Sequence, residues 1–105
     1  MGCEYTFIFS LLLQLPQQEQ LLHYLKATSS WHLMPARPGQ MPSLVRYAYL
    51  ASGPSSWDED FLVEVSSQQL YLLLHTAPAD QTTRVLTWLE QGASALGLVG
   101  TLAEL

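Results

Sequence analysis

Large apolar side chains occupy every second position along residues 5–15, the longest apolar run in the chain. A period of two is typical of a β-strand that buries one face. One parity contains Tyr5, Phe7, Phe9, Leu11, Leu13 and Leu15, and the other contains Thr6, Ile8, Ser10, Leu12 and Gln14. We therefore predict a core strand over residues 5–15, with Ile8 and Leu12 on the face opposite the core.

A first helix is predicted directly after this strand. Pro16 marks its start, and residues 17–27 place Gln18, Leu21, Leu22 and Leu25 at spacings of three and four. The connection that follows, residues 31–43, contains three prolines and a glycine, which exclude regular structure over most of its length. Residues 31–34, at its start, can form a short edge strand.

A second helix has clear signals at both ends. Pro78 lies near its first position, and Gly97 is the expected C-terminal cap. Asp80 and Arg84 are spaced to pair one turn apart, and Gly92 is a weak point inside the helix. The predicted buried stripe consists of Val85, Leu86, Leu89, Ala93 and Leu96.

Strands are also predicted at residues 44–51, 61–65 and 70–75, which are rich in β-branched, aromatic and leucine residues. The last two form a hairpin. A loop with an even number of residues places Val65 opposite Leu70 and Glu64 opposite Tyr71, which keeps the apolar side chains on one face. Residues 98–105 form either a final strand or a tail packed across the domain.

This order of elements predicts a single α+β domain over residues 1–105. The predicted fold is a two-layer sandwich with the element order β-α-β-β-β-α. Whether a final strand follows the second helix is left open. Two helices of this length cover one face of an antiparallel sheet of four to five strands. The strand order within the sheet remains open.

The second face of the sheet is too apolar for a surface that meets only water. Arg46 and Glu64 are expected to pair there. Because extended exposed apolar area usually marks an interaction site, we predict that this face is covered. The cover is a second copy, another protein, or the chain's own proline-rich connection and tail. The interface residues expected from parity are Ile8, Leu12, Leu50, Leu62 and Leu73.

The net charge and the cysteine content restrict the classes of partner and the cellular environment that fit this chain. The net charge of −5, with four basic and nine acidic residues, argues against nucleic-acid binding and favours a basic partner. The single cysteine, Cys3, excludes a disulfide framework and indicates a reducing cytoplasm. Residues 5–15 are too short to span a membrane. Lipidation at Gly2 and Cys3 is left open, because the first residues match the myristoylation pattern.

An acidic loop with one tryptophan is the sharpest local feature. Trp57, Asp58, Glu59 and Asp60 resemble a hot spot for a basic partner, with Glu64 and Tyr71 as neighbouring contacts. In the alternative interpretation, the tryptophan closes the edge of the sheet and the acids are solvated. We expect no catalytic residues, no metal and no cofactor, because none of the three histidines has a partner at a recognisable spacing.

In size, charge and element order, the chain resembles the small acidic immunity proteins that bacteria make against secreted toxins. This resemblance implies a non-enzymatic cytoplasmic inhibitor, of immunity or antitoxin type, that binds and occludes a basic toxin or effector. The alternative is a ligand-binding or regulatory α+β module that forms a homodimer through the open sheet face.

Overall fold

The computed structural model describes residues 3–50 and 59–105 of the chain. In this part, six strands form one antiparallel sheet in the order β2-β3-β4-β5-β1-β6. The elements along the chain are β1 (Cys3–Phe9), α1 (Leu15–Thr28), β2 (His32–Leu33), β3 (Leu44–Ala48), β4 (Phe61–Val65), β5 (Gln69–Leu74), α2 (Ala79–Ala95) and β6 (Gly100–Glu104).

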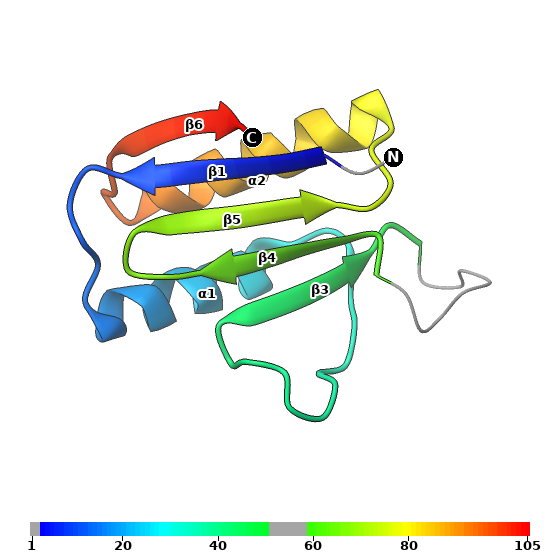
Figure 1. Ribbon diagram of the computed structural model, residues 1–105, viewed down its shortest axis with the longest axis horizontal. Helices are drawn as coiled ribbons and strands as arrows, with labels where there is room; N and C mark the ends of the chain where they lie inside the picture. Colours follow the sequence, from blue (N-terminus) through cyan, green and yellow to red (C-terminus); the bar gives the residue numbers. More distant parts are fainter. Residues whose placement is uncertain (1–2, 51–58) are drawn as a thin grey trace.

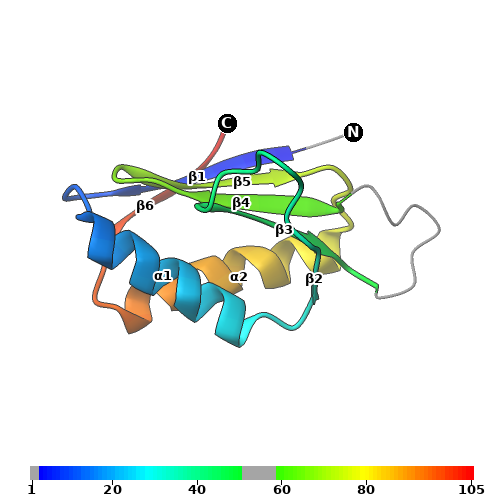
Figure 2. The same ribbon diagram turned by 90° about the horizontal axis from the view of Figure 1, so that it is seen from below.

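The two helices pack on the same face of the sheet, which gives two layers (Figures 1 and 2). This arrangement confirms the predicted α+β class, with six strands where four to five were expected. Both segments whose structure was left open are strands. β2 pairs with β3 at one edge, and β6 pairs with β1 at the other.

The first strand is shorter than its apolar pattern suggested. β1 ends at Phe9, and the backbone N–H and the side chain of Ser10 both donate to the carbonyl of Val99. Helix α1 begins at Leu15, where the N–H of Gln14 donates to the side chain of Gln17. Residues 10–14 must therefore carry the chain from the sheet layer to the helix layer, and they cannot extend the strand.

This early end overturns the predicted positions of three leucines. Leu11 and Leu15, expected in the core, are 79% and 65% exposed. Leu12 lies beyond the end of β1, so it does not belong to the sheet face. Leu13 is buried as expected, because its N–H donates to the carbonyl of Ser67 and this bond holds it against the turn after β4.

The register of the β4–β5 hairpin agrees with the prediction. Val65 lies opposite Leu70 and Glu64 opposite Tyr71, so the turn has an even number of residues. The core lies between the sheet and the helices. The inward-facing residues of the central strands are almost completely buried there: Phe61, Val63, Val65, Leu70, Leu72 and Leu74.

Two glycines, one inside α2 and one just after it, have different structural roles. Gly97 ends the helix as predicted: its φ is +71°, and the N–H of Leu98 donates to the carbonyl of Ala93. Gly92, expected to weaken the helix, is instead a point of close contact with α1. A Cβ atom at this position would lie 2.8 Å from Cδ2 of Leu25. The missing side chain therefore permits the contact between the two helices.

Candidate functional site

The face of the sheet opposite the helices carries two distinct regions. At the β3 end, the connection between β2 and β3 runs along the edge of the sheet and rises on the side away from both helices (Figures 1 and 2). Arg46 of β3 points into this connection and is only 5% exposed. Its guanidinium donates to the side chain of Gln40 at 2.9 Å and to the carbonyl of Pro35. The proline-rich connection therefore covers part of this face, one of the alternatives left open by the sequence.

Glu59 is the charged partner of Arg46 beneath this connection. Its carboxylate lies 3.3 Å from Nη1 of Arg46, 2.9 Å from Nε2 of His75 and 3.8 Å from Nη2 of Arg37. The side chain of Glu59 is only 10% exposed. The predicted pairing of Arg46 with Glu64 does not form, because the guanidinium donates to Gln40, Glu59 and the carbonyl of Pro35.

The acidic loop is described only in part. Trp57 and Asp58 lie outside the described residues. The carboxylate of Asp60 accepts from the backbone N–H of Tyr49 at 2.7 Å and from the hydroxyl of Thr76 at 3.3 Å. The two described acids of the loop thus have partners inside the domain, and they hold the strand ends of β3, β4 and β5 together.

The second region of this face lies over β4, β5 and β1, and we call it the open face. It is formed by Glu4, Ile8, Leu62, Glu64, Tyr71 and Leu73. Ile8 is 51% exposed, and Leu62 and Leu73 are half-buried neighbours that face each other across the two strands. The structure therefore brings together five of the predicted site residues: Ile8, Leu62, Glu64, Tyr71 and Leu73.

Leu12 and Leu50 are not part of this surface. Both lie beyond the ends of the strands that were expected to carry them, and both are highly exposed. Parity placed them on the sheet face only because β1 and β3 were predicted to be longer than they are.

The charges of the open face are acidic. The hydroxyl of Tyr71 donates to the carboxylate of Glu4. Burial, then this hydrogen bond and the negative charges of Glu4 and Glu64, raise the pKa of Tyr71 to about 12. Among the described residues, neither Glu4 nor Glu64 has a basic partner within 4 Å. The face thus combines apolar side chains with uncompensated negative charge.

A groove of about 680 Å³ continues from Glu64 around the edge of the sheet. It lies between the first half of α1, residues 41–43 just before β3, and the end of β4 with the turn that follows it. The described residues that line the groove include no base. Its apolar wall consists of Leu15, Leu22, Met41, Pro42 and Val65, and its acidic members are Glu19 and Glu64.

Sequence reasoning missed the groove because it assigned Leu15 to the core and Met41 to an irregular connection. The available signal was Pro16, which predicts a helix start at this position and so excludes Leu15 from the strand.

Comparisons with models of protein families, with curated proteins and with solved structures found no match. In the part of the chain that the structure describes, no helix is both long enough and apolar enough to cross a membrane.

Proposed function

We propose that this protein is a non-enzymatic binding module, of the immunity or antitoxin type, that blocks a basic protein partner. The observation that supports the proposal is the open face together with the groove. Exposed or half-exposed apolar side chains there are bordered by Glu4, Glu19 and Glu64, and no described base neutralises these acids. The apolar residues supply contact area, and the carboxylates select a partner with lysine or arginine at the rim.

Charge favours such a partner over a second copy of the chain. Each copy has a net charge of −5, and a two-fold interface through the open face would bring the same acidic surface together twice. Like charges at an interface oppose association, whereas a basic partner gains both affinity and a faster encounter. In the homodimeric alternative, the apolar contacts must therefore offset the repulsion between two acidic surfaces.

The proposal is tested by co-expressing the protein with the product of the gene next to its own and measuring the Kd of the complex. Two variants alter the open face without touching the core: E64K reverses a rim charge, and I8D places a charge on the exposed apolar position. We expect each to raise the Kd about tenfold or more. E64K replaces the attraction of the Glu64 carboxylate for a basic partner with repulsion, and I8D replaces an apolar contact with a charge that must be desolvated. The Kd of the unmodified complex should also rise steeply with salt.

E90K is the matched control, since Glu90 is exposed on α2, on the opposite side of the sheet. It makes the same change in net charge as E64K and should leave the Kd within about twofold. Equal effects of E64K and E90K would assign the binding to net charge and refute a role for the open face. A chain that forms no complex with the neighbouring product, and that light scattering shows as a dimer, would favour the regulatory alternative.

A further inference from the structure

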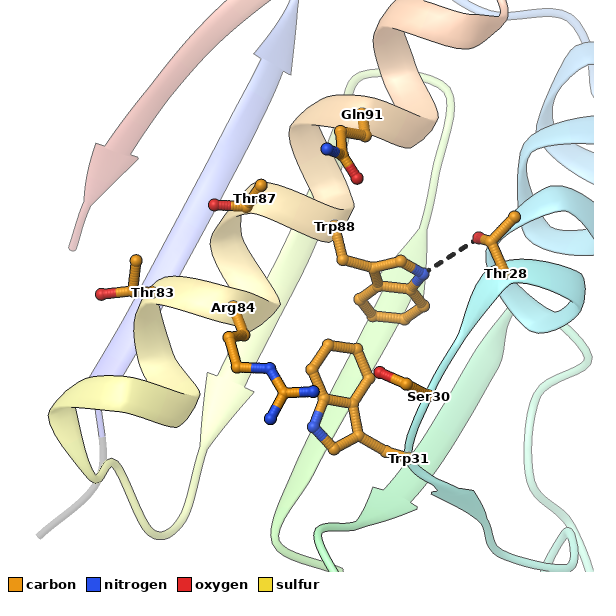
Figure 3. Close-up of a pocket in the computed structure, with 8 residues that line it drawn as sticks. All are labelled: Thr28, Ser30, Trp31, Thr83, Arg84, Thr87, Trp88 and Gln91. Carbon is orange, nitrogen blue, oxygen red and sulfur yellow. Dashed lines mark hydrogen bonds between the residues drawn. The ribbon is translucent and has the colours of Figure 1, made fainter.

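A pocket on the helix side of the domain has a composition unlike that of the open face. It lies between the end of α1, the residues before β2 and one side of α2, and its volume is about 280 Å³ (Figure 3). A space of this size can admit a ligand with a single ring. The lining residues are Thr28, Ser30, Trp31, Thr83, Arg84, Thr87, Trp88 and Gln91.

Two tryptophans form the apolar wall of this pocket. Their rings meet edge to face at 5.1 Å between centroids. The indole N–H of Trp88 donates to the hydroxyl of Thr28, and that of Trp31 donates to the side chain of Gln81. Because both N–H groups are satisfied within the protein, the rings are held in place. Trp88 is only 6% exposed, so the half-buried Trp31 offers most of the apolar surface to a ligand.

Arg84 provides the charge. Its guanidinium lies over the ring of Trp31 at 5.9 Å from the centroid, where Figure 3 shows it beside the indole. The expected pair with Asp80 does not form, and no described carboxylate lies within 4 Å of the guanidinium. In a chain with nine acids and four bases, a base held on an aromatic surface without an acidic partner is available to an anion.

The rest of the lining can complete such a contact. Within the described part of the chain, the side chains of Ser30, Thr87 and Gln91 make no hydrogen bond to the protein, although they border the same pocket. A guanidinium recognises a carboxylate through two parallel N–H donors. One arginine, in a protein with a net charge of −5, suits a monoanion better than a more highly charged phosphate.

We propose that this pocket binds a small aromatic carboxylate. Its carboxylate would bond to Arg84 and its ring would pack against Trp31 and Trp88. The site lies on the helix side, away from the open face, so it does not depend on the proposed protein partner. Binding of such a ligand would support the regulatory alternative for this domain.

The test uses three probes of the same shape and different charge: benzoate, neutral benzamide and cationic benzamidine. Titrations are followed by the indole N–H signals in ¹H–¹⁵N NMR spectra, with W57F identifying the signal of Trp57. We expect benzoate to shift the signals of Trp31 and Trp88 saturably, with a Kd of about 1 mM or tighter for so small a ligand. Benzamide should bind about tenfold more weakly, and benzamidine should produce no saturable shift.

R84Q should weaken benzoate binding about tenfold or more and should leave benzamide binding unchanged. R37Q is the control, because Arg37 carries the same charge and lies at the Glu59 network on the other face. The spectra themselves show whether each variant is folded. Equal affinity for benzoate and benzamide, an unaltered affinity of R84Q, or no saturation about twentyfold above the expected Kd would each overturn the proposal.

Discussion

Replacing Glu59 with glutamine tests whether this residue of the acidic loop stabilises the fold independently of any partner. The carboxylate is nearly buried and lies 3.3 Å from the guanidinium of Arg46, which is itself only 5% exposed. Among the described residues, no other acid pairs with Arg46, whereas Glu59 also contacts His75 and Arg37. E59Q keeps the shape of the side chain and removes its charge, so Arg46 is left buried without a counter-ion.

The expected cost is large for a single substitution. Removing one member of a buried ion pair destabilises proteins by about 3–5 kcal/mol, because the remaining charge is desolvated and unpaired. The glutamine oxygen can still accept one hydrogen bond, which places E59Q near the lower value, at about 3 kcal/mol. In a domain of this size, that loss lowers the Tm by about 12 °C. It is also a large fraction of the roughly 5–15 kcal/mol that stabilises a typical domain.

Urea unfolding measures the effect, with an unchanged m value showing that only stability has altered. E90Q is the control, because Glu90 is exposed on α2 and should change stability by less than about 0.5 kcal/mol. R46M should cost less than E59Q, since Glu59 keeps His75 and Arg37 as partners. The double variant R46M/E59L removes both charges and should regain most of the loss. If E59Q is as stable as E90Q, or if the double variant is no better than E59Q, the reasoning is wrong.

Three further changes test other parts of the structure. G97A should cost about 1 kcal/mol in urea unfolding, because the φ of +71° is strained for alanine although space is open around it; an unchanged stability would contradict this cap. E4Q should lower the pKa of Tyr71 from about 12 toward 10 in an absorbance titration. Because folding raises this pKa, the stabilising contribution of protonated Tyr71 is complete below pH 10 and is lost as the pH rises toward 12. E4Q should shift this loss of stability to lower pH. Superimposable absorbance titrations of E4Q and the unmodified protein would exclude the contact between Tyr71 and Glu4. L13Q should cost about 2–5 kcal/mol, whereas L11Q should stay within about 0.5 kcal/mol, and equal losses would mean that β1 continues past Phe9.

The features that the sequence predicts correctly are those set by local signals, either a periodic pattern or a residue type. In the β4–β5 hairpin, apolar side chains alternate on both strands, so only one register buries them together, and the pairing of Val65 with Leu70 follows. The end of α2 is predictable for a similar reason. Gly97 supplies a backbone conformation that other residues adopt at a cost, so the glycine marks the helix end.

The features that the sequence does not predict depend on where the chain must change layer. Leucine continues in alternation past Phe9, and nothing in the apolar pattern distinguishes Leu11 from Phe7. The strand ends because α1 must begin near Pro16, beneath the sheet. The role of Glu59 is hidden for a different reason. Its partners Arg46 and His75 come from β3 and the end of β5, and only the folded sheet brings them together.

The distribution of the four bases explains why the open face is acidic. Arg37 and Arg46 both pair with Glu59 under the proline-rich connection, Arg84 lies over Trp31 on the helix side, and Lys26 is exposed in the last turn of α1. No base therefore remains for Glu4 or Glu64 in the described part of the chain, and the negative charge gathers on the sheet. Under the proposed function, the partner supplies the missing positive charge. The charge balance of the sequence favours a basic partner in the same way, but it does not show that the acids without a basic partner lie on the sheet.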